Sequence, residues 1–313
     1  AKKSRWTPFH AWILTHYLFF SEERRPQLSR YLAAIANGDS LEEAAKAFGN
    51  GAKLQADVIA YDNRALPYDR MTYPPDRAPE PIVQQLTEGQ ARFLKGRIEL
   101  GSRIELPPPG ADLDPKSAER AAKYRAHAIE ARDKWLARLR ETAARYRSNV
   151  EAQLLLAEAE CRTGNHDACA AAADRALAIQ PGSSPALAWK GLAMVQQAVA
   201  GPASERAAKL RAARGVIARA NRADTEAVMP LIAYFRSYAD AGIEPPQAAM
   251  AGMLKAIDGV PAAPASKLLL GTELAREGRA DAARKTLLPV AKGGYDSPEK
   301  PKAEAVLKGL AKP

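Results

Sequence analysis

Apolar residues recur at spacings of three and four along most of this chain, the pattern of helices with one buried face. Val, Ile and Thr, which favour strands, are sparse and never alternate with polar residues over a long run. The longest stripe predicts one helix that begins at Asp114-Pro115, a pair typical of a helix N-cap and first turn. Its apolar members are Tyr124, Ala128, Ala131, Trp135, Leu139, Ala143 and Tyr146. We therefore expect an all-helical protein.

Four shorter helices are expected before this one, over residues 6–20, 26–36, 40–49 and 52–64. The first, WTPFHAWILTHYLFF, is apolar on every side and is therefore predicted to be a buried core helix. Asn37-Gly38 is a typical end for the second. Ser40 begins the third, and Glu43 three residues later predicts a capping box, in which each side chain bonds the other residue's backbone N–H.

Clusters of proline divide the chain. Proline lacks a backbone donor and interrupts helices, so the proline-rich stretch and the PPPG segment at 107–110 are predicted breaks. Together with the helix pattern they predict five parts. These are a helical subdomain (1–65), a proline-rich linker (66–81), two long helices that join to the repeats (82–148), the repeats themselves (149–297) and a capping helix (298–313).

The repeats resemble a known family. Residues 150–181, VEAQLLLAEAECRTGNHDACAAAADRALAIQP, resemble a tetratricopeptide repeat, a helix pair with small residues at the crossing and a closing proline. The matching residues are Leu156, Ala157, Gly164, Cys169, Ala176 and Pro181. Gly191, Gly242 and Gly278 mark three further pairs at irregular spacing. We therefore expect an all-α fold, a tetratricopeptide-like helical-hairpin solenoid preceded by a small helical subdomain.

The resemblance implies a binding surface, because the first helix of each pair lines the concave face of such a stack. The candidate contact residues are Glu151, Leu154, Glu158, Arg162, Ala188, Leu192, Ile232, Arg236, Leu268, Thr272 and Arg276. Leu154 and Glu158 stand where chaperone-binding members carry Lys and Asn to hold a peptide's terminal carboxylate, so that specificity is not expected. The mixture of apolar and charged groups suits a helix or an extended peptide of another protein. We expect a non-catalytic interaction scaffold.

The N-terminal piece resembles a different family. HAWILTHYLFF and RPQLSRYLAAIANGDSLEEAAKAFG resemble the closing helices of zincin-like (peptidase-MA-like) domains, which occur fused to tetratricopeptide repeats in bacterial envelope proteins. Such peptidases bind zinc through HExxH, a motif that this sequence lacks. The resemblance implies an alternative function, the regulatory or substrate-presenting C-terminal part of an envelope zinc metallopeptidase whose HExxH lies upstream.

Charge suggests a second alternative. The formal net charge is +10, and residues 115–148 hold ten Lys or Arg against four Asp or Glu. Such a basic helix is typical of a solvated face, but it also suits nucleic acid. Trp135 and Tyr146 belong to its apolar stripe, so stacking on bases is not expected.

No residue pattern for enzyme chemistry, metal binding or a cofactor occurs: there is no phosphate-binding glycine loop and no GxSxG. Of the four histidines, His16 is interpreted as a core residue with a hydrogen-bond partner. No apolar run reaches the length of a membrane span.

Cys161 and Cys169 flank the turn of the first repeat, where a disulfide is sterically reasonable, although Cys169 also fills a position that needs a small residue. The envelope resemblance implies the bacterial periplasm or cell envelope, with the cytoplasm as the alternative. The oligomeric state stays open.

Overall fold

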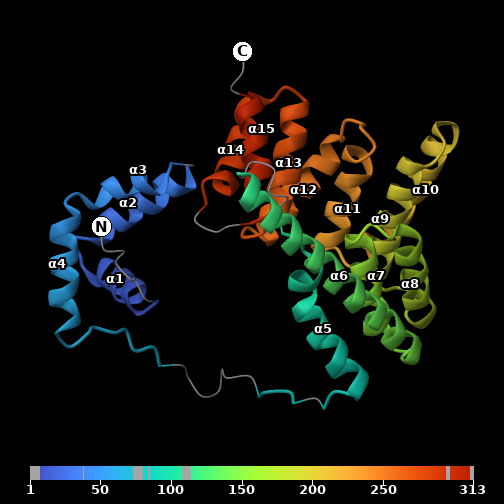
Figure 1. Cartoon of the computed structure of the whole chain (residues 1–313), viewed down its shortest axis with the longest axis horizontal. Helices are drawn as coiled ribbons and strands as arrows, with labels where there is room; N and C mark the ends of the chain where they lie inside the picture. The colour runs from blue at the N-terminus through green and yellow to red at the C-terminus, as the bar shows by residue number, and fades with distance from the viewer. Residues whose placement is uncertain are drawn as a thin grey trace. The chain divides into compact units, whose positions relative to one another are not determined.

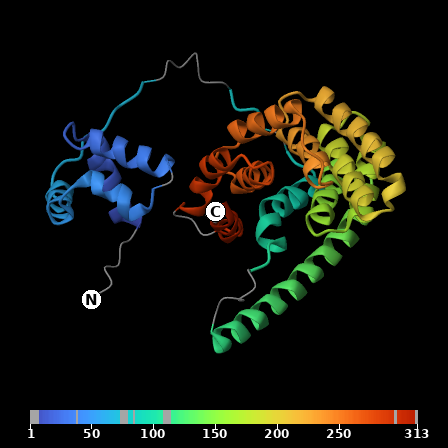
Figure 2. The same cartoon turned by 90° about the horizontal axis from the view of Figure 1, so that it is seen from above.

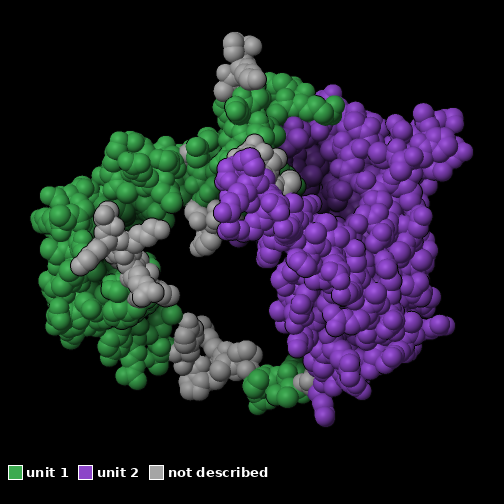
Figure 3. All heavy atoms as spheres, in the orientation of Figure 1, with its two compact units in different colours: residues 1–83, 274–313 green, residues 84–273 purple. Residues whose placement is uncertain are grey.

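The computed structural model describes residues 8–37, 39–72, 80–83, 85–107, 114–293 and 297–310, and every regular element within them is helical (Figure 1). The chain divides into two compact units (Figure 3), Ala1–Val83 with Leu274–Pro313, and Gln84–Glu273. The all-helical prediction is confirmed.

The N-terminal helices pack around a small core. They are α1 (Pro8–Phe20), α2 (Arg25–Ala36), α3 (Leu41–Ala45) with a 3₁₀ turn over Lys46–Phe48, and α4 (Gly51–Asp62). Ile13 of α1 is buried against Val58 and Tyr61 of α4. The His16 Nδ1 lies 2.9 Å from the Tyr61 hydroxyl, so His16 has the hydrogen-bond partner expected of it.

Two N-terminal predictions are wrong in detail. The helix α1 is not fully buried: Phe9, Trp12 and Phe19 are 52%, 51% and 51% exposed. Three other short helices cannot surround a helix that is apolar on every side. At the third helix, the Ser40 hydroxyl accepts from the Glu43 backbone N–H, but the Glu43 carboxylate pairs with Lys46 at 2.6 Å instead of closing the box.

The second unit begins with α5 (Glu88–Ile104), which a complete capping box of Thr87 and Gln90 opens, and the long α6 (Pro115–Arg145). Three antiparallel pairs follow, and each packs on the next (Figure 2). They are α7 (Val150–Arg162) with α8 (His166–Ile179), α9 (Ser184–Ala200) with α10 (Ala203–Ala223), and α11 (Val228–Ala239) with α12 (Gln247–Gly259). The remaining helices are α13 (Pro264–Arg276), α14 (Ala280–Ala291) and α15 (Lys300–Leu310), of which α14 and α15 pack together.

Small residues set the distance between the paired helices. Ala157, Cys169, Ala172 and Ala173 are completely buried where α7 and α8 cross. In the next pair, a methyl group on Gly191 would lie 2.4 Å from Ile217 Cγ1, closer than any real contact. The helices of these pairs therefore approach closely because at least one of the two helices has small residues at the crossing.

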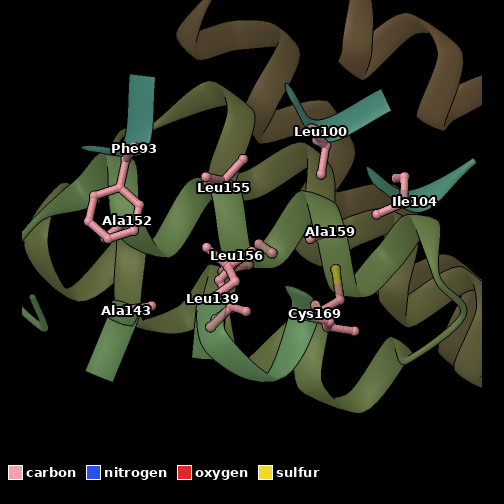
Figure 4. Packing of buried hydrophobic residues seen from close by; sticks show 14 of the residues in the cluster. Phe93, Leu100, Ile104, Leu139, Ala143, Ala152, Leu155, Leu156, Ala159 and Cys169 are labelled. Atoms are coloured by element: carbon pink, nitrogen blue, oxygen red, sulfur yellow. The ribbon is translucent and has the colours of Figure 1, made fainter. Parts of the chain in front are cut away.

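The largest core joins α5, α6, α7 and α8 (Figure 4). Its α5 members are Phe93, Leu100 and Ile104. In α6, by contrast, only residues of the second half are buried, namely Leu136, Leu139 and Ala143. Tyr124 is 68% exposed and Ala128 only half-buried, so the first half of the predicted apolar stripe contributes no buried residue to the core.

Two polar contacts hold the packed half of α6 on α7. The Glu160 carboxylate, only 1% exposed, accepts from Arg140 Nε and Nη2 at 2.6 and 2.8 Å. This pairing raises the pKa of the Arg140 guanidinium. The buried Gln153 side chain donates to the Ala143 carbonyl at 3.0 Å and accepts from Arg175 at 2.7 Å. A buried carboxylate is tolerated only when it is paired in this way.

Cys161 and Cys169 form a disulfide in the structure, with their Cα atoms 5.1 Å apart. Both sulfurs also lie 3.7 Å from the carbonyl oxygen of Trp189 on α9. The crosslink therefore lies at the joint between the first pair and the second. It closes a short loop around the Gly164 turn, where φ is +86°.

We predict that Gly191→Ala destabilises the protein by about 1–3 kcal/mol, since Ile217 must shift to admit the methyl group. The matched control is Gly215→Ala in the interior of α10, where a Cβ meets nothing within 4 Å. That change should stabilise by about 0.5–1 kcal/mol because alanine favours the helix. Urea unfolding of both variants measures the difference. Equal effects of the two changes would contradict the close approach.

We predict that thiol titration of the unfolded, unreduced protein finds no free thiol, and that reduction exposes two. Reduction should lower the free energy of unfolding by about 2–3 kcal/mol, the loop-entropy estimate for so short a loop. Thermal unfolding with and without reductant measures this, and the Cys161→Ser, Cys169→Ala double variant serves as the reference that reductant should not affect. Two thiols before reduction would disprove the crosslink.

Candidate partner-binding surfaces

The helix α5 extends the row of first helices. It runs parallel to α7: a Cβ on Gly89 would lie 3.1 Å from Asn149 near the start of α7, and Glu105 meets Arg162 at its end. Between them, a methyl group on Gly96 would lie 2.7 Å from Leu155 Cδ2, so glycine permits the close approach. In the same way, α7 contacts α9, and α9 contacts α11. The first helices α5, α7, α9 and α11 thus form one continuous row.

This arrangement involves three candidate residues of the first repeat. Glu151 pairs with Arg97 of α5 at 3.5 Å, and Arg162 pairs with Glu105 at 3.4 Å and with Glu158 at 3.4 Å. The two pairs with Arg97 and Glu105 are long and lie between solvent-accessible side chains, so each contributes little to stability. A partner on this part of the row would lie beside α5.

Three candidate contact residues lie in the core instead of on a binding face. Leu154 is 5% exposed and packs with Ala176 and Ala186, and Leu192 is 3% exposed in the core of the second pair. Ala188 is completely buried. A first helix contacts both its own partner helix and the next pair, so it must be apolar on two sides. The repeat register predicted these three positions on the exposed side of the helix, whereas they lie on a buried side. They are excluded as direct contacts.

On α11 the candidates Ile232 and Arg236 are half-buried. The Arg236 guanidinium pairs with Asp240 at 2.8 Å, and the same carboxylate accepts from Gln196 of α9. Arg236 therefore takes part in a network that ties α9 to α11. Of the α13 candidates, Leu268 is half-buried, whereas Thr272 and Arg276 are exposed.

Beside the Gly164 turn lies an open cleft of about 650 Å³, lined by residues of α6, α8 and α9. His166 is among them. Burial lowers the pKa of its imidazole, Arg236 lowers it further, and Asp167 and Asp240 act in the opposite direction. Gln197 donates to Asp167 across the cleft at 2.6 Å. Arg140 and Asn165 donate to Glu160, and Gln196 donates to Asp240, so most polar groups of this cleft bond neighbouring helices. The buried His166 Nδ1 has no hydrogen-bond partner among the described groups.

A second cleft, of about 390 Å³, lies where α5 and α6 diverge. Leu155 of α7 also lines it. These two helices touch along only part of their length, whereas α7 and α8 pack along theirs. The sequence predicts two long helices over 82–148 but not this cleft, because the divergence of α5 and α6 depends on how both pack on α7.

Within the described residues, no group of three or more His, Cys, Asp or Glu side chains is arranged to hold a metal ion. No helix in the described part of the chain is both long and apolar enough to cross a membrane. The resemblance of the N-terminal helices to zincin-like domains stays a prediction.

No protein-family profile matches this chain, and no curated protein matches it. Among solved structures, a thermophilic tetratricopeptide-repeat protein of Thermus thermophilus is similar, with a TM-score of 0.50 and 17% sequence identity. The similarity covers 60% of this chain and 94% of that one. At this identity the likeness concerns the fold alone. The chain is an all-helical protein with a tetratricopeptide-like fold.

Proposed function

We propose that this chain is a non-catalytic interaction scaffold that binds a peptide or helix of another protein on the concave face. The observation that carries the proposal is the position of α5, which lies along α7 with Phe93, Leu100 and Ile104 buried there. A row of first helices that accepts one more helix by burying a stripe of apolar residues has the chemistry of a helix-binding surface.

The surface available to a partner lies beyond the first repeat. Glu151 and Arg162 are engaged by α5, so the remaining contacts come from Ile232, Leu268 and Thr272. Two of these are half-buried and apolar, and Thr272 is exposed and polar. A partner with an apolar face and a polar rim fits this set, since apolar area supplies most of the affinity.

The disulfide between Cys161 and Cys169 supports an oxidising compartment such as the bacterial periplasm, because such bonds persist where thiols are not kept reduced.

We predict that peptides selected from a random display library on this chain lose affinity by about tenfold or more for the Thr272→Arg, Ile232→Lys double variant, since both changes bring charge to the face. The matched control is Ala251→Lys with Ala212→Arg, at exposed positions on α12 and α10. Fluorescence anisotropy of the labelled peptides measures binding. Equal loss in both double variants, or no enrichment at all, would contradict the proposal.

A second candidate function, nucleic-acid binding, is favoured by one feature of α6. Along the whole helix runs a line of exposed residues at spacings of three and four. They are Lys116, Arg120, Lys123, His127, Glu130, Lys134, Arg138, Glu141 and Arg145. Lys123 and Lys134 pair with carboxylates on the same helix. The other four Lys and Arg residues of the line make no ion pair with any described residue, so they are available to phosphates.

For this second function we predict that a fluorescent RNA or DNA duplex binds at low salt, and that affinity falls steeply as salt rises because counterions are released. Arg120→Glu with Lys116→Glu should abolish retention. Retention that is independent of salt, or equal in this variant and the unchanged chain, would remove nucleic acid as a ligand.

A further inference from the structure

The cleft between α5 and α6 has an apolar floor. Phe93 of α5, Leu139 of α6 and Leu155 of α7 line it, and they are 3%, 8% and 1% exposed. Trp135 of α6 forms part of the wall and is only partly buried, although it packs against the core. A half-buried tryptophan above an apolar floor offers area that a partner's side chain could bury, and tryptophan is enriched at the centres of interfaces.

The rim of this cleft is basic. Arg92 and Lys95 stand on the α5 side and Arg138 on the α6 side, while Glu99 is the one acidic lining residue among those described. Arg92 pairs with Glu88 on its own helix at 2.8 Å, and Lys95 lies 3.9 Å from Glu99. Arg138 has no carboxylate partner within the described part of the chain. The rim therefore has an excess of positive charge, and exposed pairs of this kind are readily exchanged for a partner's carboxylates.

These two features distinguish the cleft from the line of basic residues on α6. Arg138 belongs to both, but the rest of that line lies on the side of α6 away from its buried residues and has no apolar component, which suits a polyanion. The cleft combines a buried apolar floor with cations on both sides. Trp135 is held against the core, so its ring is not free to stack on a base as single-stranded nucleic acid requires.

We propose that the α5–α6 cleft binds a short acidic segment of a partner protein. One aliphatic or aromatic side chain of the segment enters between Phe93 and Trp135, and flanking Asp or Glu carboxylates contact Lys95 and Arg138. This inference rests on the proposed scaffold function and adds the chemistry of one ligand class. The site lies between the two helices of a diverging pair, and it is separate from the concave face that Ile232 and Thr272 represent.

The experiment uses the full chain and a labelled synthetic peptide of about twelve residues, with Leu and Phe four positions apart and Glu at the flanking positions. A peptide with Lys in place of every Glu, and a peptide with Ala in place of Leu and Phe, test charge and the apolar anchor separately. We expect binding of the first peptide alone. Quenching or a shift of tryptophan emission should occur on binding and should be absent in Trp135→Phe.

Two double variants locate the binding. Lys95→Glu with Arg138→Glu should weaken binding by about tenfold or more, since like charges then face the carboxylates. Arg211→Glu with Arg219→Glu changes the net charge equally at exposed positions of α10 and should leave binding unchanged. Circular dichroism verifies that all variants are folded. Equal weakening in both double variants would show attraction by net charge and would overturn the proposal.

Each of the following outcomes would also overturn the cleft proposal. Equal binding of the alanine peptide would remove the apolar anchor, and displacement of the peptide by a short RNA at lower concentration would reassign the site to a polyanion; either result overturns the proposal. If the Thr272→Arg, Ile232→Lys variant binds the peptide more weakly and the Lys95→Glu, Arg138→Glu variant does not, the cleft is refuted as the binding site and the concave face is supported. No binding of this peptide, with library peptides still bound, would refute the cleft and leave the scaffold function standing.

Discussion

The close approach of paired helices is the constraint on which the rest of this structure depends. Where α7 crosses α8, Ala157, Cys169, Ala172 and Ala173 are completely buried, and where α9 crosses α10, Gly191 lies against Ile217. Because at least one helix of each pair has small residues at the crossing, each pair is thin, and its outer apolar residues reach the next pair. The pairs can then share one continuous core, as expected of repeats that cannot bury their apolar surface alone.

The two helices before these pairs, α5 and α6, depart from this rule, and their departure creates the features of functional interest. α5 approaches α7 through Gly96, but α6 is held on α7 by its second half through Leu136, Leu139 and the Arg140–Glu160 pair. Two helices that are each fixed to a third need not pack fully on one another. A cleft therefore remains between them, and the first half of α6 projects with its charged residues exposed.

Charge has different roles in the two halves of α6. Glu160 is almost completely buried, so its guanidinium partner is part of the packing of α6 on α7. In the exposed half, pairs such as Lys123 with Glu119 are surrounded by water and contribute little to stability. The basic residues there are therefore free to meet a partner, whereas Arg140 is not.

The sequence by itself determined the all-helical, tetratricopeptide-like fold and the glycine turns. Periodicity, small crossing residues and the glycines at the turns are local signals, and Gly164, Gly242 and Gly278 all adopt the positive φ that such turns require. Tertiary packing decided which side of each helix is open. Leu154 and Leu192 are core residues, α1 keeps Phe9 and Trp12 exposed, and the cleft beside Trp135 exists because α5 and α6 both pack on α7. The exposure of a side chain depends on neighbours that lie far away in the sequence, so a local pattern cannot predict it.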